Sequence, residues 1–154
     1  MSYLKYWKIS EIKQIHEEIE YQHGVLEDWF KKAIIETIKE EFISFDEIAE
    51  MEITDENYNS GEIRVNGTEY LIFKDSYYLD EYLKEYLTDD PYMWKMSVKD
   101  DCTTLGLEDW ASEVIRYDGA DQILGTETIY DYNPIVLKRE IIIFLGDKNG
   151  RIKT

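Results

Sequence analysis

The sequence predicts a single-domain α+β fold, with a mostly antiparallel sheet of about four strands, an N-terminal helical hairpin and further packed helices. Three observations carry this prediction. The first fifty residues show helical periodicity, Asn66-Gly67 joins two β-rich runs, and two more β-rich runs close the chain around Pro134. A length of 154 residues fits one domain. We expect residues 1–50 to be its helical part and residues 51–154 its α+β part.

The helical hairpin is predicted from two apolar patterns. In residues 10–22 three isoleucines recur on one helical face, and Gly24 can end that helix. The run VLEDWFKKAIIETIKEEF then has apolar residues at helical spacing from Val25 to Phe42, which predicts a second helix of that length.

A short third helix and a β-hairpin follow. Ser44, with Glu47 three residues later, is a capping-box pattern that opens a helix. The polar stretch TDENYNSG (54–61) indicates a loop. Two β-rich runs then flank Asn66-Gly67, the pair that a two-residue type I′ turn prefers because both residues take a positive φ.

The remaining helices are predicted from caps. Asp75 is placed to cap the helix that contains LDEYLKEYLTDD (79–90), whose leucine and tyrosine stripe we expect to pack on the preceding hairpin. Asp90-Pro91 opens another short helix, and LEDWASEVIRYDG is a helix that we expect to end at Gly119.

Charge is the most unusual property of the composition. The chain has 34 acidic and 17 basic residues, a net charge of −17. Residues 40–90 hold 16 acids and three bases, so this third carries −13 of the total. On the helix at 79–90, Glu81, Glu85 and Asp89 are four residues apart and form a row of carboxylates. Such charge disfavours direct binding of nucleic acid or anionic membrane and favours a basic protein partner, although a solvated acidic surface is the alternative reading.

Motifs for catalysis or for metal binding are not found. The sequence contains none of the nucleophile, phosphate-loop or zinc patterns, so we expect neither an enzyme nor a bound metal or cofactor. The single cysteine, Cys102, excludes an internal disulfide, and no apolar run approaches the roughly 20 residues of a membrane span. We expect a cytoplasmic protein that does not bind membranes.

Two segments resemble a group of small acidic accessory proteins encoded by bacteriophages and mobile elements. They are VNGTEYLIFKDSYYLDEYLKEYLTDD (65–90) and WASEVIRYDG (110–119). In that pattern an Asn/Gly turn leads to a strand, an aspartate opens an acidic helix, and an aromatic-led helix ends in YDG. Residues 1–50 lie outside the resemblance. It implies a phage-type accessory protein, a class that includes anti-restriction and anti-CRISPR inhibitors.

From these observations we expect a phage-type anti-defence inhibitor in the host cytoplasm. As an acidic nucleic-acid mimic, it would bind the basic DNA- or RNA-binding groove of a host defence protein, such as a CRISPR effector or a restriction enzyme. The expected partner-binding residues are Asp80, Glu81, Glu85, Asp89, Asp90, Glu47, Glu50, Asp55 and Glu56. The alternative is a structural or regulatory interaction module that uses an apolar patch around Trp94 or Trp110 to form a homodimer or to hold a phage component.

Overall fold

The computed structural model describes residues 9–56, 59–100 and 104–140 and confirms the α+β class. Over these ranges the chain forms six helices and five strands. They are α1 (Ile9–His23), α2 (Asp28–Glu40), α3 (Phe45–Glu50), β1 (Glu52–Glu56), β2 (Ser60–Val65), β3 (Thr68–Phe73), α4 (Ser76–Asp89), α5 (Tyr92–Asp100), α6 (Leu107–Leu124), β4 (Glu127–Asp131) and β5 (Ile135–Glu140). Cys102 lies outside the described residues.

The five strands form one antiparallel sheet in the order β1-β2-β3-β5-β4. The predicted hairpin is confirmed: β2 pairs with β3, and Asn66 and Gly67 have φ of 51° and 77°. The two closing strands pair with each other, and β5 also pairs with β3, so β5 lies inside the sheet between β3 and β4.

β1 is the strand that the sequence did not predict. It begins at Glu52 and includes Thr54, the first residue of the stretch expected to be a loop. Acidic residues have low strand propensity, but pairing with β2, including Ile53 opposite Ile63, supplies the backbone hydrogen bonds that make it an edge strand.

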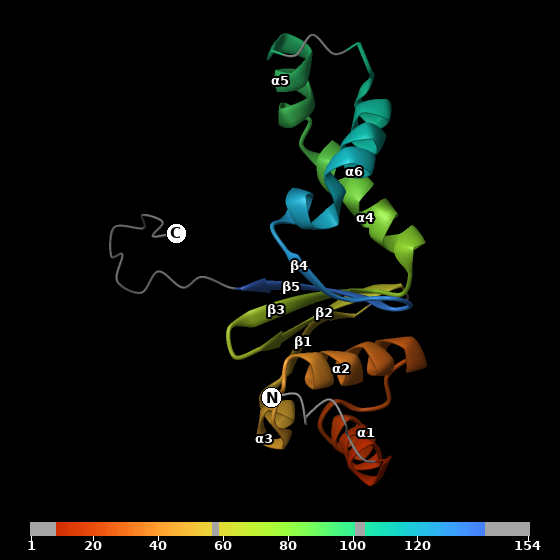
Figure 1. Ribbon diagram of the computed structural model, residues 1–154, viewed down its shortest axis with the longest axis vertical. Coiled ribbons are helices and arrows are strands. Elements are labelled where there is room, and N and C mark those ends of the chain that lie inside the picture. The colour runs from red at the N-terminus through yellow and green to blue at the C-terminus, as the bar shows by residue number, and fades with distance from the viewer. Residues whose placement is uncertain (1–8, 57–58, 101–103, 141–154) are drawn as a thin grey trace, which may run out of the picture.

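Helices cover both faces of the sheet (Figure 1). α1, α2 and α3 form a layer on one face, which we call the helical layer, and α4 and α6 rise from the other face. Strand alternation explains this arrangement, because Tyr70 and Ile72 of β3 join the core under the helical layer whereas Leu71 and Phe73 join the opposite one. α4, α5 and α6 together form a projection that we call the arm, with α5 farthest from the sheet (Figure 1).

The second helix is shorter than its apolar pattern predicted. α2 begins at Asp28, so Val25 precedes the helix and is exposed. α2 ends at Glu40, and Phe42 lies beyond it in the left-handed region with φ of 53°. The N–H of Ile43 bonds back to the carbonyl of Ile38 at 3.0 Å, which closes the helix end and reverses the chain.

The helix that was expected to end at Gly119 breaks there, because Gly119 has a non-helical φ of 79° and ψ of 167°. The range of α6 therefore consists of two helical segments on either side of this kink, and the second ends at Leu124 before Gly125. The segment after the kink is favoured because Ala120, Ile123 and Leu124 pack into the core on that face of the sheet.

Candidate functional site

α4 is the element that carries the predicted acidic row, and its start is fixed locally. The Asp75 carboxylate accepts hydrogen bonds from the backbone N–H groups of Tyr77 and Tyr78 at 3.0 and 3.3 Å, as its N-cap position predicted. The Ser44–Glu47 capping box that opens α3 is formed as well. Both helix starts are therefore set by residues within one turn.

Only part of the apolar stripe of α4 packs on the sheet, which corrects the expectation that all of it would. Leu79, Tyr82 and Leu83 join the arm-side core, whose buried members are Leu71, Phe73, Leu83, Leu124, Ile135 and Leu137. Tyr86 is exposed and Leu87 is half-buried. The reason is geometric: α4 leaves the sheet at an angle, and its contacts with α6 are more extensive than those with β3 (Figure 1).

The acidic side of α4 faces solvent. Asp80, Glu81, Glu85 and Asp89 are all exposed, and none of them forms an ion pair with a residue that the structure describes. Other acids of the fold do have such partners. Ion pairs join Glu20 to Lys31, Glu36 to Lys39, Glu41 to Lys138 and Glu69 to two arginines. The carboxylates of α4 thus keep their charge available to a partner.

Two hollows flank this carboxylate row. One, of about 520 Å³, lies between α4 and the start of β2 and is lined by Asn59, Ser60, Tyr78, Glu81, Tyr82, Lys84, Glu85, Thr88 and Glu108. The other, of about 430 Å³, lies between α4 and α6 and is lined by Asp80, Glu81, Lys84, Ser112, Ile115 and Arg116. Glu81 and Lys84 line both hollows, and Arg116 is a second base at the smaller one. The exposed carboxylates of α4 therefore lie beside two polar depressions, with Lys84 among them.

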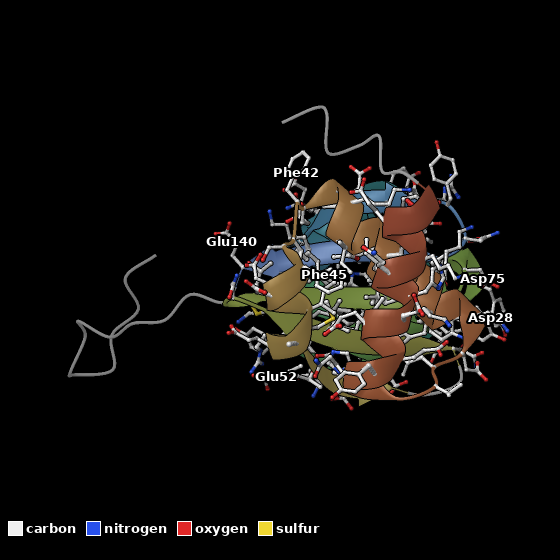
Figure 2. The ribbon with its side chains drawn as sticks, turned by 90° about the horizontal axis from the view of Figure 1, so that it is seen from below. Asp28, Phe42, Phe45, Glu52, Asp75 and Glu140 are labelled. Carbon is white, nitrogen blue, oxygen red and sulfur yellow. The ribbon has the colours of Figure 1, made fainter. Side chains whose placement is uncertain are left out.

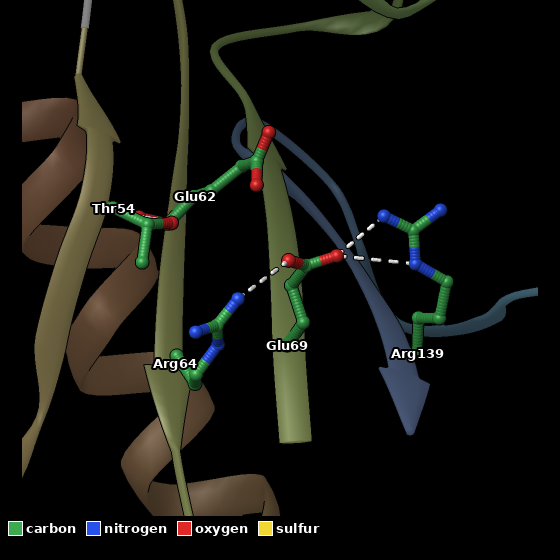
Figure 3. Close-up of polar contacts among 5 residues, drawn as sticks. All are labelled: Thr54, Glu62, Arg64, Glu69 and Arg139. Carbon is green, nitrogen blue, oxygen red and sulfur yellow. Dashed lines mark hydrogen bonds and ion pairs between the residues drawn. The ribbon is translucent and has the colours of Figure 1, made fainter. Parts of the chain in front are cut away.

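The sheet beside the arm carries a buried carboxylate that sequence reasoning missed. Figure 3 shows Glu69 of β3 between Arg64 of β2 and Arg139 of β5. Arg139 donates from Nε to Glu69 Oε1 at 3.1 Å and also from Nη2, while Arg64 Nη2 lies 3.6 Å from Oε2. Because Glu69 and Arg139 are seventy residues apart, only strand pairing could reveal this bridge across three strands.

The same part of the sheet influences one tyrosine of the arm. Burial raises the pKa of the Tyr82 hydroxyl, and the Glu62 carboxylate raises it further. Glu62 lies on the face shown in Figure 3, together with Arg64 and Glu69. The Tyr82 hydroxyl therefore stays neutral. Its side chain packs in the arm-side core and lines one of the two hollows beside α4.

The structure does not bring the nine predicted partner-binding residues onto one surface. Asp80, Glu81, Glu85, Asp89 and Asp90 belong to the arm, whereas Glu47 and Glu50 belong to α3 in the helical layer on the opposite side of the sheet (Figure 1). Asp55 and Glu56 are in edge strand β1. Residues 40–90 run through both faces of the sheet, so the concentration of charge along the sequence is divided in space.

Two of these nine residues have a structural role. The Asp90 carboxylate accepts from the backbone N–H of Tyr92 at 3.2 Å and so caps α5. Glu47 accepts from the backbone N–H of Ser44 at 2.8 Å and also from the side-chain amide of Asn66 in the hairpin turn. Both positions are therefore explained by the fold without a partner.

Only one of the two tryptophans named in the alternative hypothesis lies at an exposed apolar surface. Trp110 is 8% exposed and belongs to the interior of the arm, so it cannot form a surface patch. Trp94 is half-buried, and its indole N–H donates to the carbonyl of Leu105 at 2.9 Å. Around it α5 has no buried residue and exposes Tyr92, Met93 and Val98.

Neither a metal cluster nor a membrane helix is found in the described part of the chain. No three His, Cys, Asp or Glu side chains there are grouped so that they could hold a metal ion. No helix in the same ranges is both long and apolar enough to span a bilayer. Comparisons with protein-family models, with curated proteins and with solved structures give no significant match to this chain.

Proposed function

We infer that the protein is a non-enzymatic inhibitor that docks its arm onto a basic protein surface. The observation that carries this proposal is the row of exposed α4 carboxylates without ion-pair partners among the described residues, in a chain with a net charge of −17. The surface of a stable fold usually carries charged side chains of both signs side by side, and like charges four residues apart destabilise a helix. A basic partner would relieve that repulsion.

The target class that best fits is the nucleic-acid-binding groove of a host defence protein, such as a CRISPR effector or a restriction enzyme. Such a groove presents Lys and Arg spaced to meet phosphates, and a row of carboxylates occupies it by the same attraction. This proposal assigns the contact to Asp80, Glu81, Glu85 and Asp89. It places the protein in the host cytoplasm and treats its phage-type origin as part of the hypothesis.

The test is capture of a partner with two charge-matched variants. The triple reversal Glu81→Lys, Glu85→Lys, Asp89→Lys changes the net charge from −17 to −11, because each reversal adds two charges. The control, Glu17→Lys, Asp28→Lys, Glu40→Lys, makes the same change with exposed acids of the helical layer. Proteins captured from a bacterial lysate on the tagged wild type are compared with those captured on each variant.

We expect the α4 variant to lose the partner and the control to retain it. Three reversed surface charges remove about 2 to 3 kcal/mol of binding free energy, which is roughly 30- to 150-fold in affinity. Binding should also weaken steeply between 50 mM and 500 mM salt, since the screening length falls well below about 10 Å over that range. Equal loss in both variants would show that only net charge matters, and normal capture by the α4 variant would refute the assignment to the arm.

A second candidate function rests on α5. Its exposed Tyr92 and Met93 favour a structural or regulatory module that binds through an apolar contact, including a homodimer. An apolar contact responds little to salt, so capture that persists at 500 mM salt and is lost in Met93→Asp would support this candidate over the first.

A further inference from the structure

A second surface lies in the helical layer, on the side of the sheet opposite the arm. Between α1 and the segment that joins α2 to α3 there is a pocket of about 340 Å³, lined by Glu11, Gln14, Ile15, Phe42, Ile43, Ser44 and Phe45. Ile15 and Ile43 are buried and belong to the core under this layer, so they form an apolar floor. The volume is within the range of roughly 300 to 1,000 Å³ that binding pockets have.

Two phenylalanines at this pocket are exposed. Phe42 is 38% exposed and Phe45 is 48% exposed, and neither is among the buried residues of the core. Figure 2 shows Phe42 projecting outward at the edge of the helical layer and Phe45 between α3 and α1. Neighbouring exposed aromatic side chains beside an apolar pocket mark a contact surface more often than isolated ones do.

Phe42 also has an unusual backbone conformation. With φ of 53° it occupies the left-handed position after a helix end, where glycine or asparagine is usual and a bulky residue is rare. The fold alone would favour glycine there. A phenylalanine at this place instead keeps an aromatic ring at the rim of the pocket, which points to a role in binding.

Charge around the pocket identifies the kind of occupant. Among its described lining residues Glu11 is charged and none is basic, and α3, which begins with Phe45, has the sequence FDEIAE with three acids and no base. A second copy of the chain would bring the same acids against these, which disfavours self-association. A segment that places a bulky apolar side chain next to Lys or Arg complements both the apolar floor and the acidic surroundings.

We propose that this pocket, with Phe42 and Phe45 as its rim, binds a bulky apolar side chain carried on a basic segment of a partner protein. The site is distinct from the arm, because α3 and α4 lie on opposite faces of the sheet (Figure 1). The protein can therefore hold a partner at two places. Variants of one surface leave the other intact.

The test uses two fluorescein-labelled peptides, KKRLWRKK and KKRAARKK, titrated against the full-length protein by fluorescence anisotropy. The peptides have the same charge and differ only in the central apolar pair. We expect the first to bind at least about tenfold more tightly, since burial of a bulky apolar side chain is worth that factor or more. Phe45→Ala and Phe42→Gly should each reduce its affinity to that of the second peptide.

Controls separate this site from general attraction to an acidic protein. Tyr21→Ala removes another aromatic side chain of the helical layer, 83% exposed, and should leave the preference unchanged. The α4 triple reversal should preserve the difference between the peptides even if it weakens both. Thermal unfolding followed by circular dichroism verifies that each variant is folded. If Phe42→Gly does not fold, the test of the pocket rests on Phe45→Ala.

Three results would overturn the proposal. Equal affinity of the wild type for both peptides would show attraction by charge alone. Retention of the preference in Phe45→Ala would place the apolar contact elsewhere. A wild-type dimer in sedimentation velocity that Phe45→Ala converts to a monomer would assign the pocket to a second copy of this chain.

Discussion

Leu83 anchors the arm to the sheet, and its truncation should be far more costly than that of Leu87, one turn later on the same helix. Leu83 is 1% exposed in the arm-side core, whereas Leu87 is half-buried and lies outside that core. Leu83→Ala should lower the free energy of unfolding by about 3 kcal/mol, from lost transfer free energy plus the cavity left behind. Leu87→Ala should cost about 1 kcal/mol, because part of its surface is already in water and no closed cavity forms.

Urea unfolding, followed by tryptophan fluorescence and circular dichroism, measures both values. A cost of about 3 kcal/mol corresponds to a fall in Tm of roughly 6 to 12 °C for a chain of this size. The two variants share the same chemical change and the same helix, so propensity cancels between them. Equal costs would mean that the whole stripe packs alike, as the sequence suggested, and would refute the arrangement in which α4 leaves the sheet.

Two further predictions concern the backbone and pH. Gly119 has φ of 79° and ψ of 167°, a region that is essentially restricted to glycine, and a Cβ there would meet no atom within 4 Å. Gly119→Ala should therefore cost about 1 to 3 kcal/mol from backbone conformation alone, and a cost near zero in urea unfolding would contradict the kink. Burial, with help from the hydrogen bond to Glu41, raises the pKa of Tyr70 above its ordinary value of 10.0. The unfolded chain then loses this proton first as pH rises, so stability should fall above about pH 10, and Tyr70→Phe should make the fall shallower in unfolding midpoints measured from pH 9 to 11.

The division of the acids governs how the functional hypothesis is tested. Had the acids of α3 and α4 shared one face, charge reversal anywhere in residues 40–90 would give the same result. Because the sheet separates them, charge reversals in α4 and in the helical layer change the net charge by the same amount but alter two different surfaces. The comparison therefore distinguishes a specific contact from a general effect of net charge.

The sequence by itself determined the features that depend on neighbours in the chain. The Asn66-Gly67 turn, the Ser44–Glu47 capping box and the Asp75 cap were all correctly predicted. Each is fixed by hydrogen bonds or φ preferences within a few residues, and these are the same wherever the segment lies in a fold. The α+β class followed because hydrophobic periodicity reports which kind of element each segment forms.

Only the tertiary structure decided which residues share a surface. Strand β1 exists because β2 offers it a partner, and Glu69 meets Arg139 because β3 and β5 pair across seventy positions. Phe42 fits the apolar pattern of α2, yet it is exposed, because the helix ends before it and the chain reverses. Long-range pairing and the direction in which helices leave a sheet depend on packing between distant segments, and local sequence carries little information about either.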